Sequence, residues 1–122
     1  MPKYSYLLCF VAIFSVCLAV NIYRQPNITS NETTLQSYQS SHHAFINNTS
    51  HEVSAYVKQW LTSALSHLKR NAKILEVGSG FGKDARYIQQ QGFTIQCSDA
   101  VPAFVEHLRT NGFNAQKMNV LT

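Results

Sequence analysis

The sequence is poor in charged residues and in cysteine. Charged side chains make up 13% of its 122 residues and hydrophobic side chains 45%, a balance typical of a globular chain and not of a disordered tail. A chain of this length can bury one modest core. Cys9 and Cys17 lie in an apolar N-terminal stretch, which leaves Cys97 alone in the remaining chain, so no disulfide framework can form there. This cysteine usage fits a reducing compartment.

The sequence also lacks a dense basic cluster, although its net charge is +4. The tightest group of cations, Lys69, Arg70 and Lys73, follows an expected helix, where the helix dipole favours positive charge. We prefer that interpretation to nucleic-acid binding and expect no nucleic-acid partner. The histidines have no third ligand at metal-binding spacing, so no metal site is predicted.

An uncharged apolar run from Tyr6 to Val20 stands out in the N-terminal part. It predicts a signal peptide or a single membrane anchor over residues 1–23, which would export the chain or bring residues 4–23 into contact with a membrane. A buried helix or a mis-assigned start codon is the alternative, and the chain would then be cytoplasmic. Residues 24–48 are rich in Asn, Ser, Thr and Gln, and we interpret them as a polar linker.

Hydrophobic spacing indicates a folded domain over residues 49–122. Thr49 and Glu52 have the spacing of a capping box, which predicts that a helix begins there. Apolar residues then recur at helical spacing and predict one continuous apolar stripe. The members of this stripe are Val53, Tyr56, Val57, Trp60, Leu61, Ala64, Leu65 and Leu68.

Beyond that helix, short apolar runs alternate with helical segments. The apolar runs predict three buried strands, at 73–77, 93–97 and 115–120. Helices are expected between them, from 83 to about 91 and from 102 to 111. This order predicts an α/β fold with a parallel sheet and right-handed crossovers.

A glycine-rich turn follows the first expected strand. Glycines stand at positions 78, 80 and 82 after Glu76, and Asp99 lies just past the second strand. Bare backbone lets a ligand approach closely, and the amides that open the next helix can face a polar group. A carboxylate at the end of the neighbouring strand can accept hydrogen bonds from ribose hydroxyls. The alternative is a purely structural turn, with Asp99 as a loop residue or a helix cap.

Two other nucleotide sites fit this turn less well. Lys83 stands where a dinucleotide-binding turn needs a small residue for close helix packing. A phosphate-binding loop is excluded because no Gly-Lys-Ser/Thr follows at the required distance. An acid followed by glycines at alternate positions therefore favours a different nucleoside ligand.

Three segments of the sequence resemble one enzyme family. Ile74 to Gly82, with Lys83-Asp84-Ala85-Arg86 after it, resembles motif I of the class I S-adenosylmethionine-dependent methyltransferases, especially the small bacterial-type members. Ser98-Asp99-Ala100-Val101-Pro102 resembles the Asp-Ala-Ser-Pro of the same group, and Tyr38…Ala44-Phe45…Thr49 resembles the segment before motif I. The resemblance covers about Tyr38 to Thr122.

The resemblance implies a Rossmann-like fold that binds S-adenosylmethionine and transfers its methyl group to a small-molecule or unknown acceptor. Glu76 would orient the methionine amine, Asp99 would bind the ribose hydroxyls, and Asn119 would face the adenine amino group. No catalytic base is identified, since His107 and Tyr87 qualify only by residue type. The cofactor-binding residues implied in this way are Glu76, Gly78, Ser79, Gly80, Gly82, Asp99 and Asn119.

The chain departs from the family pattern in two notable places. Val101 stands where serine usually caps the following helix, a change that should cost about 1 kcal/mol of capping. The family fold has seven strands, whereas this chain provides only the first three, which leaves an open sheet edge for a partner to complete. A truncated methyltransferase is therefore the main hypothesis. An inactive remnant, and a membrane-anchored module whose glycine turn is structural, are the alternatives.

Overall fold

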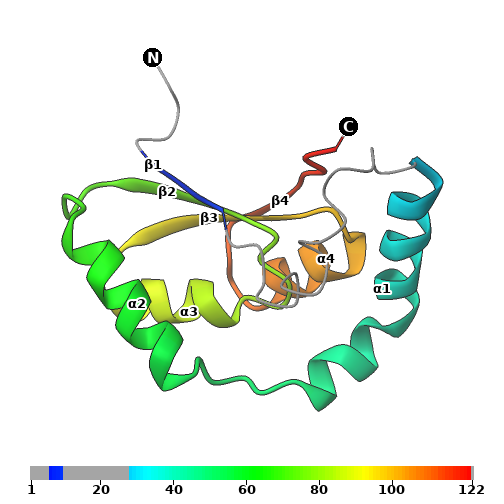
Figure 1. Cartoon of the computed structure of the whole chain (residues 1–122), viewed down its shortest axis with the longest axis horizontal. Coiled ribbons are helices and arrows are strands. Elements are labelled where there is room, and N and C mark those ends of the chain that lie inside the picture. Colours follow the sequence, from blue (N-terminus) through cyan, green and yellow to red (C-terminus); the bar gives the residue numbers. More distant parts are fainter. Residues whose placement is uncertain (1–5, 10–27, 122) are drawn as a thin grey trace.

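The computed structural model describes residues 6–9 and 28–121. It shows an α/β fold with a parallel sheet of four strands in the order β1-β2-β3-β4 (Figure 1), which confirms the predicted class and sheet type. The strands are β1 (Tyr6–Cys9), β2 (Lys73–Val77), β3 (Thr94–Asp99) and β4 (Ala115–Lys117). The helices are α1 (Ile28–Asn48), α2 (Ala55–Ser66), α3 (Lys83–Gln90) and α4 (Pro102–Thr110).

Three of these helices cover one side of the sheet. Figure 1 shows α2, α3 and α4 on the same side, with α3 and α4 each connecting successive strands. Right-handed crossovers that advance in one direction across a parallel sheet place their helices on one face. The main core lies between that face and the helices, and Leu61, Ile88 and Leu108 are completely buried in it. Its other buried members are Val53, Leu65, Ile74, Ala85, Ile95, Cys97, Val105, Phe113 and Ala115.

Strands β2 and β3 end level with each other. Their register places Glu76 opposite Cys97 and Val77 opposite Ser98. Because the strands are parallel, the turn after β2 and the last residue of β3, Asp99, lie at the same edge of the sheet. This edge is where the glycine-rich turn and the predicted ribose-binding carboxylate meet.

Helix α1 occupies most of the segment that we predicted to be a linker, residues 24–48. Its hydroxyl side chains bond to carbonyl oxygens one turn back, as Ser37 Oγ does to Thr33 O at 2.9 Å, so their polar groups are satisfied within the helix. The linker prediction was wrong because it relied on polar composition alone, whereas α1 packs against α4, a helix distant in sequence.

A second apolar cluster joins α1 to α4 and to the turn after β2. The ring centroid of Phe45 lies 5.6 Å from that of Phe104 and 6.1 Å from that of Phe81. Gln39 Oε1 also accepts a hydrogen bond from Ala103 N at 2.9 Å. Helix α1 is therefore part of the folded unit and borders the glycine turn. The buried members of this cluster are Ile46, Phe81, Val101 and Phe104.

Helix α2 begins later than we predicted. It starts at Ala55, with Ser54 as N-cap and Ser54 Oγ accepting a hydrogen bond from Val57 N at 3.4 Å, so Thr49 and Glu52 do not cap it. The predicted stripe is only partly buried. Its inner members Val53, Leu61 and Leu65 are buried in the core, whereas Tyr56 and Trp60 are 73% and 49% exposed. The predicted stripe is wider than the face that α2 turns toward the core.

Strand β1 lies within the apolar run for which we predicted a signal peptide or membrane anchor. It pairs in parallel with β2, from Tyr6 opposite Ile74 to Cys9 opposite Val77. The sheet thus has one strand more than the three that we predicted. Most of residues 1–23 lie outside the described part, and no helix within the described part is long and apolar enough to cross a membrane. Membrane contact and export stay predictions.

Candidate functional site

The turn between β2 and α3 is built from glycines in left-handed conformations. Gly78, Gly80 and Gly82 have φ angles of 78°, 55° and 90°. Residues with side chains rarely adopt such values, so the path of this turn depends on glycine. The amides of Gly78 and Ser79 both donate to Ser98 O, at 2.9 and 2.8 Å, which ties the turn to the end of β3.

Gly80 and Gly82 differ in the space around them. A Cβ on Gly82 would lie 2.8 Å from Leu108 Cδ2 and 3.0 Å from Phe113 Cε2, so this glycine lets α3 begin close against the core. A Cβ on Gly80 would meet no atom within 4 Å. Packing therefore explains Gly82, whereas the backbone of Gly80 borders open space that a ligand can enter.

Asp99 contacts the glycine turn directly. Its Oδ2 accepts a hydrogen bond from Gly80 N at 2.8 Å, and its Oδ1 accepts one from Val101 N at 2.9 Å. Burial raises the pKa of this carboxyl, while hydrogen bonds from the amides of Val101, Gly80 and Ala100 lower it. Asp99 thus holds the amide of Val101, the N-cap residue of α4. Val101 itself makes no side-chain cap bond, as the sequence predicted.

Glu76 is buried beneath the turn. Its side chain is 1% exposed, and its Oε2 has no hydrogen-bond partner. Burial raises the pKa of Glu76 from 4.5 to about 7, a bond from Ser79 opposes the rise, and the charges of Asp84 and Asp99 add to it. Glu76 is therefore near the midpoint of its titration at neutral pH, and a positive charge brought by a ligand would favour its ionised form.

Ser79 holds the ends of two strands together. Its Oγ accepts a hydrogen bond from Ser98 N at 3.2 Å, and Ser98 Oγ donates to Glu76 O at 2.7 Å. Both serine side chains are buried. We predicted Ser79 as a cofactor-binding residue, and the contacts of its side chain position the turn.

Asp84 lies in the first turn of α3 and was not among the predicted site residues. Its Oδ1 is buried without a hydrogen-bond partner. Burial raises the pKa of Asp84, and the charge of Lys83 lowers it. The sequence offered only a weak signal for this residue, its place in the segment that resembles motif I, because acids are common in the first turn of a helix.

Asn119 lies two residues beyond the end of β4 at Lys117. Its Oδ1 accepts a hydrogen bond from Leu121 N at 3.1 Å, so the oxygen that we expected to face an adenine amino group is used locally. Met118 N donates to Asp99 O at 2.9 Å, which keeps the chain after β4 beside the end of β3. The structure therefore places this segment beside Asp99, with the Asn119 side chain bonded to its own loop.

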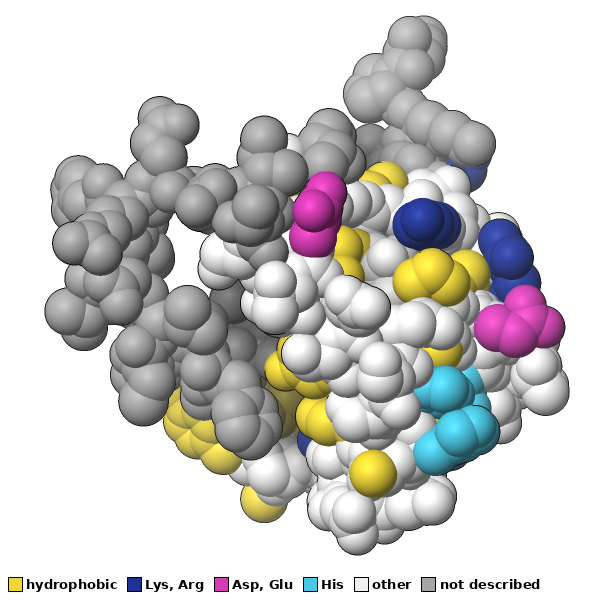
Figure 2. All heavy atoms as spheres, turned by 90° about the vertical axis from the view of Figure 1, so that its right-hand side faces the viewer, with side chains coloured by type: hydrophobic (Ala, Val, Ile, Leu, Met, Phe, Trp, Pro, Cys, Tyr) yellow, Lys and Arg dark blue, Asp and Glu magenta, His cyan; other side chains and the backbone are white. Residues whose placement is uncertain are grey.

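The two side chains that qualified as bases by type make contacts elsewhere. Tyr87 Oη lies 2.8 Å from Thr62 Oγ1, which joins α3 to α2. His107 lines a groove between α1 and α4 with His42 and His43, and Figure 2 shows histidines gathered on this side of the molecule. Burial lowers the pKa of His107. No three His, Cys, Asp or Glu side chains in the described part of the chain group closely enough to hold a metal ion.

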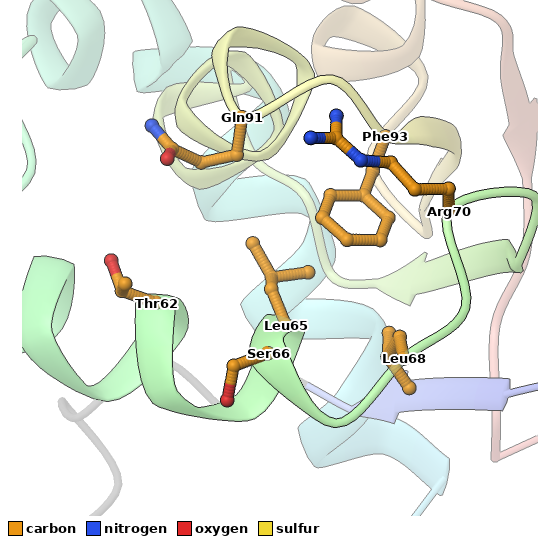
Figure 3. Close-up of a pocket in the computed structure, with 7 residues that line it drawn as sticks. All are labelled: Thr62, Leu65, Ser66, Leu68, Arg70, Gln91 and Phe93. Carbon is orange, nitrogen blue, oxygen red and sulfur yellow. The ribbon is translucent and has the colours of Figure 1, made fainter.

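A hollow at the opposite edge of the sheet is a weaker candidate. Figure 3 shows Thr62, Leu65 and Ser66 of α2 on one side of it, with Gln91 and Phe93 on the other. Its lining comes from segments that precede β2 and β3, whereas ligands of open parallel sheets bind outside the carboxyl ends of the strands. The glycine turn therefore remains the best-placed site.

No protein-family model matches this chain, and neither curated proteins nor solved structures yield a match.

Proposed function

We propose that this chain binds S-adenosylmethionine at the turn between β2 and α3, as the cofactor-binding part of a class I methyltransferase with a Rossmann-like fold. One observation carries the proposal: the open space beside Gly80 directly adjoins the Asp99 carboxylate, at the carboxyl ends of neighbouring parallel strands. β2 is also an interior strand, between β1 and β3.

The residues at this edge fit the parts of that cofactor. A carboxylate has about four acceptor positions, so the bonds that Asp99 accepts from the amides of Gly80, Val101 and Ala100 leave capacity for one hydroxyl of a ribose. The bare backbone at Gly80 admits the nucleoside beside that carboxylate. The unpartnered Oε2 of Glu76 is an acceptor for the amine of the methionine part.

The cofactor supplies an electrophilic methyl group when it is bound. The task of the protein in such a transfer is to hold donor and acceptor in line, and most of the acceleration comes from that positioning. In this chain Gly80 and Asp99 would fix the nucleoside, and Glu76 would fix the amino-acid end.

The alternative is that the turn is purely structural and binds no ligand. The hydrogen bonds of Asp99 favour this alternative. Asp99 accepts hydrogen bonds from the amides of Gly80 and Val101, which is what a purely structural carboxylate would do. Gly82 is likewise explained by packing. Neither contact explains why Gly80 borders open space or why Glu76 is buried with an unpartnered oxygen, so we favour the cofactor site.

Gly80→Ala tests this proposal with little risk to the fold. The new methyl group would enter the space that the nucleoside needs, and isothermal titration calorimetry with S-adenosylhomocysteine should show heat for the unmodified chain and none for the variant. Gly112→Ala is the matched control. Gly112 has a φ of 83° and no atom within 4 Å of its ideal Cβ, so both variants bear about the same 1–2 kcal/mol of left-handed strain.

Only the variant at the turn should lose binding. Absence of heat for the unmodified chain would remove the cofactor proposal and favour the structural turn. Equal loss of binding in both variants would show that general destabilisation, and not occupation of the site, is responsible.

A further inference from the structure

Three histidines line a groove between α1 and α4, which we call the histidine groove. His42 and His43 belong to α1 and His107 to α4, and Figure 2 shows histidines gathered on this side of the molecule. The groove has a volume of about 530 Å³, so water can enter it. Histidine is the side chain that changes its charge near neutral pH, and the groove therefore concentrates titratable groups between two helices. Its other lining residues are Gln39, Pro102, Ala103, Glu106 and Thr110.

The two histidines of α1 lie against each other. The ring centroids of His42 and His43 are 4.0 Å apart, and their planes are tilted by 38°. His42 Nδ1 lies 2.7 Å from Gln39 O. Because a carbonyl oxygen only accepts, Nδ1 carries a proton and Nε2 is the nitrogen of His42 that titrates. Neutral rings are stable at this separation, whereas two imidazolium rings repel each other.

His107 adds a third ring from the opposite side of the groove. Burial is the main cause that lowers the pKa of His107, and nearby positive charge lowers it further. Glu106 is the one carboxylate among the residues that line the groove, and its charge opposes this effect. A histidine with a lowered pKa binds its proton less readily when the helices are packed, so protonation disfavours the packing. The positive charge comes from His51, Arg86, His42 and His43.

The histidine groove adjoins the contacts that hold α1 on the domain. Gln39 Oε1 accepts a hydrogen bond from Ala103 N at 2.9 Å, and both residues line the groove. Further along α1, the ring centroid of Phe45 lies 6.1 Å from that of Phe81, which stands between Gly80 and Gly82 in the glycine turn. Loosening α1 therefore also uncovers the flank of that turn.

We propose that α1 docks on α4 in a pH-dependent way, and that protonation of His42, His43 and His107 loosens it and uncovers Phe81. The docking is complete above about pH 7 and weakens as pH falls through about 6.5, where histidines gain their charge. It requires no bound cofactor, so the chain alone can test it whether or not the proposed function holds.

Hydrogen exchange of the α1 amides measures this docking. The protection factor divides the intrinsic exchange rate by the observed rate and so removes the pH dependence of the exchange chemistry. Dividing the protection of α1 by that of α3 also removes changes in global stability. We expect this ratio to fall by about fivefold from about pH 7.5 to about pH 5.5, the equivalent of about 1 kcal/mol, which is the repulsion of two charges 4 Å apart in water.

Substitutions show whether the histidines cause the fall. His43→Gln combined with His107→Gln should reduce it to less than about twofold, since one titrating ring then remains in the groove. His67→Gln, at the exposed C-cap of α2, is the matched control and should keep the full response. A constant ratio in the unmodified chain would overturn the proposal, as would an equal response in the double variant and in the control.

A second variant covers the case in which the double variant fails to dock α1 at neutral pH. Glu106→Gln removes the carboxylate that opposes the positive charge, at an exposed position of α4. The α1 ratio of this variant should fall more steeply with acid than that of the unmodified chain. A fall that is no larger would mean that charge in the groove does not control the docking of α1.

Discussion

Replacing Gly82 by alanine should destabilise the fold more than the same replacement at Gly112. Both glycines have positive φ angles, 90° and 83°, so each variant bears about 1–2 kcal/mol of left-handed strain. They differ in their surroundings. The new Cβ at position 82 would lie 2.8 Å from Leu108 Cδ2, whereas the one at position 112 would meet nothing within 4 Å.

The steric part of this cost comes from a core that cannot move aside easily. Leu108 is completely buried and Phe113 is 6% exposed, so both side chains are held by other core residues. Overpacking of a filled core costs about 1–3 kcal/mol. The total for Gly82→Ala is therefore about 2–5 kcal/mol, a large share of the roughly 5–15 kcal/mol that stabilises an ordinary domain.

Urea unfolding followed by circular dichroism measures this difference. The free energy of unfolding of Gly82→Ala should lie about 1–3 kcal/mol below that of Gly112→Ala. Adding Leu108→Ala to Gly82→Ala removes the closest contact. The loss of unfolding free energy in the double variant should therefore be smaller than the sum of the losses in the two single variants, by at least about 0.5 kcal/mol. Equal losses at Gly82 and Gly112, or strict additivity with Leu108, would refute the packing argument.

Two further predictions concern the buried acid and helix α1. Burial raises the pKa of Glu76 from 4.5 to about 7, so the folded state holds its proton more tightly than the unfolded state. The free energy of unfolding should therefore fall by up to about 3 kcal/mol as pH rises from about 5 to about 8. Urea unfolding of Glu76→Gln should show a smaller fall, and an unchanged one would contradict the burial argument. Gln39→Ala leaves Ala103 N without its acceptor and should loosen α1 by about 0.5–1.5 kcal/mol. Hydrogen exchange of α1 amides should then quicken, but not in Gln36→Ala, because the hydrogen bond to Ala103 N comes from Gln39.

The elements around the glycine turn could be predicted closely from the sequence. The strand expected at 73–77 coincides with β2, and the helix expected from residue 83 begins there as α3. Short apolar runs bounded by glycine signal a buried parallel strand locally, without knowledge of its partners. The acid at the carboxyl end of the next strand was also predicted, and in the structure the Asp99 carboxylate accepts a hydrogen bond from Gly80 N.

Elements whose stability depends on distant partners were missed. Helix α1 has a polar composition and is held by Phe45 and Gln39 against α4. Strand β1 lies in an apolar run that suits a membrane span equally well, and only its pairing with β2 distinguishes a strand. Local periodicity carries no information about such contacts, because the residues that make them are far apart in the chain.

The sequence alone determined where the chain turns, which backbone positions lack side chains, and that acids stand near the ends of two successive strands. Tertiary structure decided what each of those residues does. It placed Leu108 against Gly82 and left space beside Gly80, gave Asp99 backbone donors, and left buried oxygens of Glu76 and Asp84 without partners. Packing, burial and hydrogen bonding depend on which distant side chains come together, and spacing along the chain does not encode that arrangement locally.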